Sequence, residues 1–477
     1  MSGINSVMNI ARNALSTYEL AMNVTGHNIA NATTPGYTRQ TAVLSSESPL
    51  TMGKLQLGMG VEVSSVTQAF DRYTNQAILQ NTSVLSENEA KASALSYLEG
   101  IFNETTSYGL NQALADFWNA WQDLAGNPGG TPERTALLDK AEALCTQFNS
   151  MSRDLNQVIN SMNSNLNSGI SECNQITSQI AALNEKIVAA ESNGSKANDL
   201  RDQRNTLLES LSKLIGNNSF ENESGSVTVM TSEGILLVDG NQSWSFSRAG
   251  NQIYYNGVTT DVSQRLTGGK IGAWLDVRDE IAPQYLANLD ELAGTLIEEV
   301  NTVHSAGFDL SGTTGTNFFE ALSNPAVHAG SAAFIQLSAD VQGNPAGIAA
   351  GGQSGSSGDN ENALRMADLQ TDDTISILKW SYQSRGTSNT SNPQSTSFED
   401  FYRALVGNMG ILSSGVTQNQ EFAQSLLDNL TEVRDSISGV NLDEEMTELM
   451  KIQRGFEAAS KLIAMADEML QALLQIR

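Results

Sequence analysis

Apolar residues recur every seven positions near the end of the chain, a pattern typical of helices that pack side by side. Within 438–477, one series is Leu442, Leu449, Phe456, Ile463 and Leu470, and a second is Glu445, Ile452, Ala459, Ala466 and Leu473. Nine of these ten positions are apolar. A helix with such a seam needs another helix alongside to remove its stripe from water. The pattern therefore predicts a long terminal helix with a helical partner.

The first thirty residues carry a matching pattern. One series is Met1, Met8, Leu15, Met22 and Ile29, and the interleaved series is Ile4, Ala11, Tyr18 and Thr25. Pro35 disfavours helix at the residue before it and Gly36 permits a reversal, so this helix is expected to end near 31–34. We expect the two terminal helices to pair, although spacing alone also fits two unrelated helices of one globular core.

Helical spacing also fills most of the interior. The longest segment begins near Pro132, and its seam covers ~46 residues or about 70 Å, with Gly169 as a weak point. Further helices are predicted at 69–103, 110–124, 198–215, from 272 through 283–305, at 398–407 and at 416–436. Such lengths indicate an elongated, rod-like molecule.

Short β-rich runs interrupt the helices once. They are 227–230, 235–238, 244–247 and 253–255, and Asn256-Gly257 after the last of them favours a hairpin turn. This pattern predicts a small antiparallel unit. Residues 42–66 are expected to form an extended loop and 313–358, rich in Gly, Ser and Ala, a flexible surface loop.

Together these elements predict a mainly α fold: an elongated coiled-coil-like helical bundle formed by the N- and C-terminal parts of the chain, with a small inserted antiparallel β domain and Gly/Ser-rich loops. A chain of 477 residues is too long for one ordinary core. We predict a terminal axial coiled-coil domain of 1–40 with 438–477, a long helical bundle domain of 41–216 with 269–437, and an inserted β-rich outer domain of 217–268.

Charge narrows the classes of partner. The net charge of -27 repels nucleic-acid backbones and anionic lipid, so neither nucleic-acid binding nor membrane association is expected. No apolar run approaches the ~18 residues that span a bilayer. A cleavable secretory signal is also not expected, because the N-terminus lacks a basic cluster followed by a continuous apolar stretch.

Residues that carry chemistry are scattered. His27, His304 and His328 are far apart in sequence, and Cys145 and Cys173 lack metal-ligand spacing. The two cysteines fall on one helical seam about 42 Å apart, so they are expected to stay reduced. We therefore expect no catalytic residues, no cofactor and no metal site.

Two long motifs identify a family. Residues 28–40 read NIANATTPGYTRQ, and 438–476 read SGVNLDEEMTELMKIQRGFEAASKLIAMADEMLQALLQI. These resemble the N- and C-terminal signatures of the axial proteins of the bacterial flagellum, which form its rod, hook and junctions. The interior segments NDLRDQRNTLLESL at 198–211, VNTVHSAGFDLSGTTGTNFF at 300–319 and GDNENAL at 358–364 are similar to the hook-associated members, which join hook to filament.

The resemblance implies a structural subunit that is exported unfolded through the flagellum's own type III secretion channel and polymerised as a ring at the hook tip. The implied partners are the hook protein, the second hook-filament junction protein and a cytoplasmic export chaperone on the C-terminal segment. The implied location is the extracellular flagellum. The seams and the Pro-Gly-Tyr turn together predict a subunit interface at Ile4, Met8, Ala11, Leu15, Tyr18, Met22, Asn28, Ile29, Asn31, Pro35, Gly36, Tyr37, Leu442, Leu449, Ile452, Phe456, Ile463, Leu470 and Leu473.

Two alternatives stay open at this stage. A secreted peptidoglycan hydrolase of the flagellar rod would need a separate compact domain with well-placed carboxylates. A bulk filament subunit, flagellin, lacks the Pro-Gly-Tyr signature. We also expect the terminal helices to become fully ordered only on assembly, because two isolated helices bury too little surface to offset their ordering.

Overall fold

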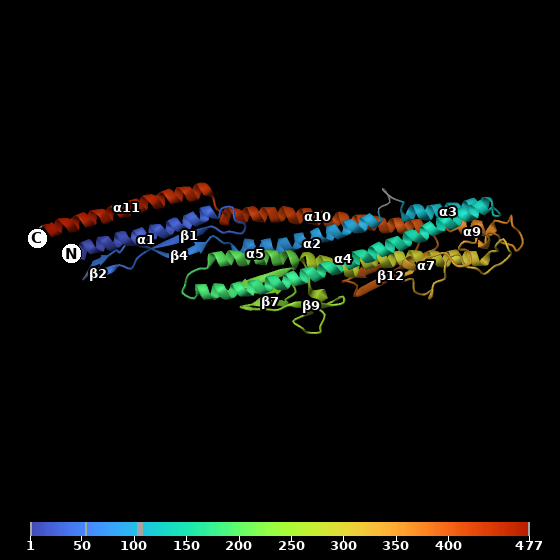
Figure 1. The fold of residues 1–477 in the computed structure, drawn as a ribbon, viewed down its shortest axis with the longest axis horizontal. Helices are drawn as coiled ribbons and strands as arrows, with labels where there is room; N and C mark the ends of the chain where they lie inside the picture. Colours follow the sequence, from blue (N-terminus) through green and yellow to red (C-terminus); the bar gives the residue numbers. More distant parts are fainter. Residues whose placement is uncertain (1, 53–54, 103–107, 476–477) are drawn as a thin grey trace.

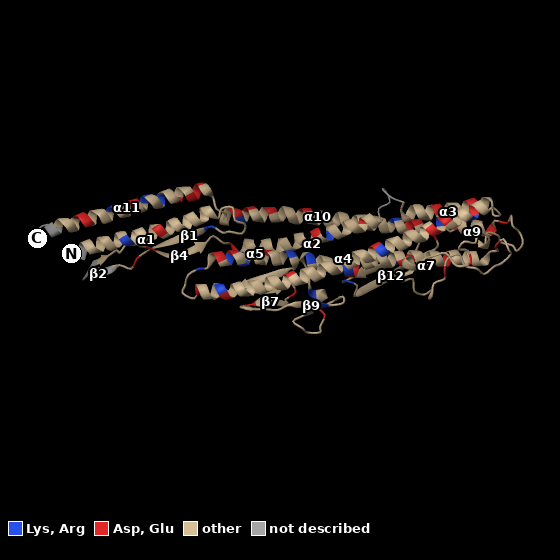
Figure 2. Cartoon of the chain, in the orientation of Figure 1, with Lys and Arg blue, Asp and Glu red and all other residues tan. Residues whose placement is uncertain are grey.

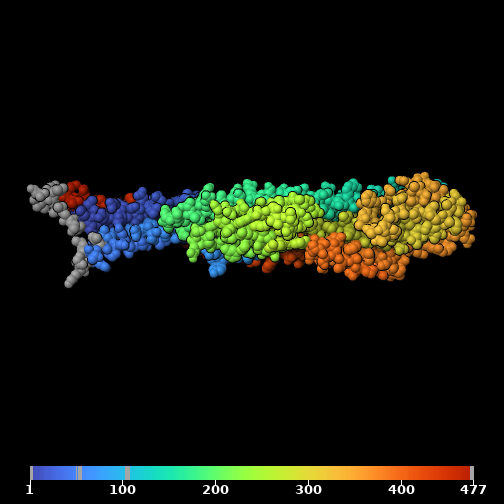
Figure 3. All heavy atoms as spheres, turned by 90° about the horizontal axis from the view of Figure 1, so that it is seen from below, coloured from blue at the N-terminus to red at the C-terminus, as the bar shows by residue number. Residues whose placement is uncertain are grey.

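The computed structural model describes residues 2–52, 55–102 and 108–475, and it shows a long, narrow molecule (Figures 1 and 3). At one end α1 (Ser2–Ala30) lies beside α11 (Leu442–Gln475), so the first and last described residues lie at the same end (Figure 1). The rest of the chain forms a helical body that continues away from this pair. The prediction of a mainly α, elongated fold is confirmed.

Long helices run along the body. The longest, α4 (Thr131–Glu191), has 61 residues and spans about 90 Å. The other helices of the body are α2 (Arg72–Phe102), α3 (Leu110–Gly126), α5 (Asn198–Leu214), α6 (Gly269–Asp276) continued by a π-helical turn (Val277–Ile281) into α7 (Ala282–Ala306), α8 (Ser331–Phe334), α9 (Glu361–Asp368) and α10 (Phe398–Ser438). α4 is continuous through Gly169. An added Cβ there would lie 2.7 Å from the Trp274 ring, so the glycine lets α6 pack closely.

The expectation of an extended loop at 42–66 is wrong. This segment forms two antiparallel hairpins, β1 (Gln40–Ser46) with β4 (Val61–Gln68), and β2 (Leu50–Met52) with β3 (Leu55–Leu57). The β1–β4 ladder begins at Gln40 opposite Gln68 and has an irregularity between Val43 and Leu44. It forms because α1 offers a surface to cover: both strands contact α1, and Thr17 Oγ donates to the carbonyl of Val61 at 2.9 Å.

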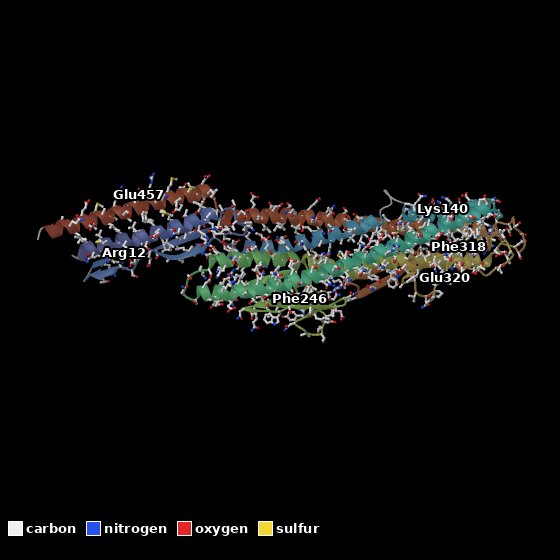
Figure 4. The ribbon with its side chains drawn as sticks, viewed as in Figure 1. Arg12, Lys140, Phe246, Phe318, Glu320 and Glu457 are labelled. Atoms are coloured by element: carbon white, nitrogen blue, oxygen red, sulfur yellow. The ribbon has the colours of Figure 1, made fainter. Side chains whose placement is uncertain are left out.

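Three of the four interior β-rich runs correspond to strands, the run 244–247 is strand only from 246, and two more strands join them. β5 (Asn217–Glu221), β6 (Val227–Thr231), β7 (Leu236–Asp239) and β8 (Gln242–Ser243) form one antiparallel sheet, and β9 (Phe246–Ala249) pairs with β10 (Gln252–Tyr255). The strands share one hydrophobic core with α4 and α5. Figure 4 labels Phe246, which is buried there beside α4. Segment 217–268 therefore does not have a core of its own.

A second core fills the far end of the body. Phe117, Trp118 and Trp121 of α3 are fully buried. Phe117 and Trp121 pack against Phe318, and Trp118 stacks on Phe398. The expectation that 313–358 is a flexible surface loop is thus wrong for much of its length. Few residues there are regular helix or strand, and Val327 and Phe334 are exposed, but Phe318, Phe319, Ile335 and Ile348 are buried in this core, which composition alone does not reveal.

The end of the body departs from the pattern in two further ways. The two helices predicted at 398–407 and 416–436 are one continuous helix, α10, because its glycines leave the backbone ladder intact. A hairpin of β11 (Ser376–Gln383) and β12 (Ser388–Ser395), which the sequence pattern did not indicate, precedes it. β11 packs on α7, whereas every residue of β12 is exposed.

Candidate subunit interface at the terminal helix pair

The two terminal helices contact each other within one chain, as their seams predict. The most buried positions of α11 are Glu445, Ile452, Ala459 and Ala466, which recur every seven residues. On α1, Ala11, Thr17, Ala21, Thr25 and Asn28 are buried. Ala459 and Ala466 of α11 and Ala11 and Ala21 of α1 are among these buried residues, and side chains this small allow two backbones to lie close together.

The larger seam residues lie around this centre. Ile4, Met8, Leu15, Tyr18, Met22, Ile29, Leu449, Phe456, Ile463 and Leu470 are half-buried, and Leu442 is exposed. Phe456 is thus already partly covered in the single chain. Met1 and the side chain of Leu473 lie outside the described residues. Whether the half-buried residues contact a second subunit stays a prediction.

Tyr18 fixes how closely the helices approach. A Cβ added to Gly455 of α11 would lie 2.6 Å from the Cζ of Tyr18, closer than carbon atoms pack. Glycine in the middle of a helix costs about 1 kcal/mol relative to alanine. Here it makes room for an aromatic ring from the partner helix.

A polar network joins the helix pair to the turn that follows α1. Asn28 is its centre, because its buried side chain makes four hydrogen bonds. Its amide nitrogen donates to the carbonyl of Gln40 at 2.8 Å and to Glu445 Oε2 at 2.9 Å. Its amide oxygen accepts from the Gln40 N–H at 2.9 Å and from the Tyr37 hydroxyl at 2.7 Å. One side chain thus connects α1, the turn and α11.

Arg39 completes the connection to the C-terminal helices. Its Nε donates to Glu445 Oε1 at 2.7 Å, and its backbone N–H donates to the carbonyl of Ser438 at 2.9 Å. Glu444 lies 3.3 Å from the Arg39 Nη1, but its carboxylate is exposed. The only polar position of the α11 seam is therefore a buried carboxylate with a charged and an uncharged partner.

The same turn is bound to the body through α5. Thr38 donates its backbone N–H to Asp202 Oδ2 at 2.9 Å and its hydroxyl to Asp202 Oδ1 at 2.7 Å. Gln40 Nε2 donates to Asp199 at 2.7 Å. Burial raises the pKa of Asp202 to about 6, despite the hydrogen bonds from Thr38 that favour its ionised form.

The remaining predicted turn residues have separate roles. Asn31 Nδ2 donates to the carbonyl of His27 at 3.0 Å and its Oδ1 accepts from the Thr34 hydroxyl at 3.1 Å, which closes the end of α1. Pro35 is exposed. Gly36 has φ of +76° and lies against Thr206, so a side chain there would be strained and would clash. Burial and the nearby carboxylates of α5 and α11 raise the pKa of Tyr37.

Pattern reading did not assign roles to Thr38, Arg39, Gln40, Asp202 or Glu445, although these residues form the network. One signal was present: Glu445 is the single polar residue in ten seam positions, and a charge at such a position needs a partner from another segment. Asp202 carries no comparable signal, because its partner Thr38 lies 164 residues away.

Beside this network lies a polar cavity of about 590 Å³, between the turn at 31–39, the start of α2, α5 and the α10–α11 connection. Over the described ranges, no cluster of three or more histidine, cysteine or acidic side chains is arranged to hold a metal ion. None of the helices described there is long and apolar enough to cross a membrane.

Three family models match this chain. The model of the flagellar hook-associated protein FlgK helical domain matches residues 95–319, that of the flagellar basal body rod FlgEFG protein C-terminal matches 435–476, and that of the flagella basal body rod protein matches 8–38. The two rod-protein models thus cover most of α1 and α11, and the helical-domain model covers the interior from α2 to the segment after α7.

Curated relatives match from end to end. Flagellar hook-associated protein 1 of Bacillus subtilis (strain 168) is 28% identical, with 97% of this chain and 96% of the relative covered. The protein of the same name from Escherichia coli (strain K12) is 24% identical over 99% of this chain and 100% of the relative. The solved flagellar hook junction protein FlgK from Burkholderia pseudomallei has the same fold, with a TM-score of 0.65 and 16% identity over 76% of this chain and all of that one. Along its whole length the chain is thus similar to proteins named flagellar hook-associated protein 1.

Proposed function

We propose that this chain is a structural subunit that joins the hook of a bacterial flagellum to its filament and assembles through its terminal helix pair. The observation that carries the proposal is the end-to-end match to proteins named flagellar hook-associated protein 1. Its role is structural and not catalytic, and neither a rod-type hydrolase nor a bulk filament subunit is favoured by these relatives. The Asn28–Glu445–Arg39 network supports the assembly step, because it holds both chain ends in one unit.

The outer face of α11 supports self-association. Leu442, Met446, Met450, Leu462, Met465 and Met469 are each exposed by 41 to 53%. Val7 of α1 and three of these residues line a shallow apolar groove of about 430 Å³. Contiguous exposed apolar side chains mark contact surfaces, so this face suits contact with another subunit. We propose that subunits form a ring in which this face and the half-buried seam residues meet neighbouring copies.

Finer assignments belong to the same proposal. The hook protein would contact one side of the ring and the second hook-filament junction protein the other, and a cytoplasmic chaperone would hold the C-terminal segment before export through the flagellar type III channel. Cys145 and Cys173 are free and buried in α4. A chain whose described cysteines need no oxidation is suited to folding after passage through a narrow channel.

The experiment is deletion of the gene in its host, followed by electron microscopy of the cells and analysis of the medium. We expect intact hooks without filaments, and unpolymerised flagellin in the medium. Complementation with the full chain should restore filaments. Filaments in the deletion strain would refute the junction role, and loss of the hooks themselves would assign the chain to the hook or rod instead. Antibody labelling confined to the filament base separates a junction from a bulk subunit.

A further inference from the structure

One face of α10 is free of charge and open to solvent. Residues 404–420 contain no Asp, Glu, Lys or Arg, and Figure 2 shows this part of the helix in tan. Ile411 is 74% exposed and Phe422 is 72% exposed. With about 100° per residue, one stripe on this face holds Ala404, Gly407, Ile411, Gly415, Gln418 and Phe422. We call these residues the α10 stripe.

Glycines flank the exposed isoleucine on this stripe. A Cβ added to Gly407 or Gly415 would meet no atom within 4 Å, so neither glycine makes room for a group of this chain. Each costs the helix about 1 kcal/mol relative to alanine. Because these two glycines have no side chains, Ile411 protrudes from the surface around it, which is uncharged. This shape allows a second backbone to approach closely.

A groove with an apolar floor lies on a different side of α2. Figure 1 shows α2 between α10 and α4, and the groove lies between α2, α4 and the start of α6, with a volume of about 760 Å³. Its floor is apolar, from Ala94, Val158 and Met162, and Trp274 lines one side. Tyr97 stands at the edge with 75% of its surface exposed. We call this site the α2–α4 groove.

Stripe and groove lie at the same level along the molecule. The Tyr402 and Phe102 rings are 6.2 Å apart, and from there α10 and α2 run back side by side toward the terminal pair. Ile411 lies nine residues, about 13 Å, from Tyr402, and Ser93 at the middle of the groove lies nine residues from Phe102. The groove spans 89–101 on α2, and this matches the level of 403–415 on α10.

We propose that the α10 stripe docks into the α2–α4 groove of a second copy of this chain, with Ile411 as the inserted side chain. The contact joins two different surfaces, so each subunit can bind one neighbour on each side, the arrangement that builds closed rings. Because both surfaces lie at one level, the contact repeats without a shift along the axis. The uncharged stripe adds no like-charge pair to a groove whose lining includes Glu89, Asp154 and Lys270, so two chains of the same strong net charge can meet there without added repulsion. This inference rests on the proposed ring assembly.

The test uses glycine variants that leave the single chain folded. Gly415→Leu puts a bulky side chain on the stripe, and Gly410→Leu puts the same side chain on α10 about 140° away. Gly410 is also exposed with nothing within 4 Å, so both changes should leave the melting temperature of the monomer unchanged or raise it. In a strain without the native gene, we expect Gly415→Leu to lower the fraction of hooks that carry filaments at least tenfold and Gly410→Leu to leave it near the wild-type value. Equal effects of the two variants would overturn the proposal.

Cysteine cross-linking identifies the contact itself. A chain with Ile411→Cys and Tyr97→Cys is expressed in the deletion strain, and isolated hook and filament complexes are treated with a short bismaleimide. Cys145 and Cys173 do not interfere, because both are buried. We expect a ladder of dimers, trimers and larger species from the double variant and monomer from each single variant. Filaments with no ladder would refute this contact while the junction role stands, whereas filaments in the uncomplemented deletion strain would refute the junction role. Dimers from Ile411→Cys alone would mean that two stripes meet each other, contrary to the proposal.

Discussion

Glu445→Gln tests whether the buried network holds α11 against the rest of the chain. The change keeps the size of the side chain but removes the charge that pairs with Arg39 Nε at 2.7 Å, and it sets an amide group against Asn28 Nδ2 or Arg39, which are both donors. A hydrogen bond to a charged group contributes about 1.5 to 3 kcal/mol. Arg39 is about one third exposed, so the loss should fall below that for a fully buried ion pair. We expect the free energy that holds α11 in place to fall by about 2 to 3 kcal/mol.

Amide hydrogen exchange followed by mass spectrometry measures this effect locally. Exchange in peptides from 442–475 should accelerate roughly 30- to 150-fold, since each 1.4 kcal/mol corresponds to a factor of ten, while peptides from α4 should keep their rates. Glu444→Gln is the matched control, because this neighbouring carboxylate lies 3.3 Å from the same arginine but is exposed. Exposed pairs contribute less than about 1 kcal/mol. If both variants accelerate exchange equally, the buried network does not hold α11 and the reasoning is wrong.

Three further predictions concern other parts of the chain. Gly455→Ala should lower the stability of the terminal pair, because the added Cβ meets the Tyr18 ring. Gly410→Ala should raise stability by about 1 kcal/mol, because its Cβ meets no atom and alanine favours the helix. Chemical denaturation of the two purified variants measures both changes. The pKa of Asp202 is raised to about 6, so the wild type loses stability as the pH rises from about 4 through 6. The melting temperature of Asp202→Asn should therefore improve relative to that of the wild type over this pH range. A difference in melting temperature that stays constant with pH would contradict this. Burial raises the pKa values of Cys145 and Cys173 to about 12, so both thiols should react with iodoacetamide only after the chain unfolds, and rapid labelling of the native protein would show that α4 opens locally.

Periodicity revealed the long helices because each buries one continuous stripe, as α4 does along its 61 residues. Pairing of α1 with α11 could also be expected, since each seam needs a partner. The β1–β4 hairpin could not be recognised, because its strands are short and gain stability from covering α1. The burial of Phe318 and Phe319 could not be predicted for a similar reason, because an irregular segment has no periodicity that shows which side chains point inward.

The interface network shows the same limit. Asn28 was singled out, but Glu445, which accepts from its amide nitrogen, lies 417 residues away, and Asp202, which binds Thr38, lies 164 residues from it. Such contacts depend on which elements lie side by side in the fold, and the spacing of residues along the sequence does not show this. Glu445 carried a partial signal that was not used: a carboxylate in an apolar seam needs a partner, although the sequence does not show which one.

The terminal helix pair is attached to the body by two separate segments, the turn after Ala30 and the short connection from Ser438 to Leu442. Arg39 links these segments through its backbone N–H on the Ser438 carbonyl. Rotation of the helix pair about its own length would have to break this link and also the hydrogen bonds from Thr38 to Asp202 of α5. The attachment therefore transmits torque from the body to the terminal pair.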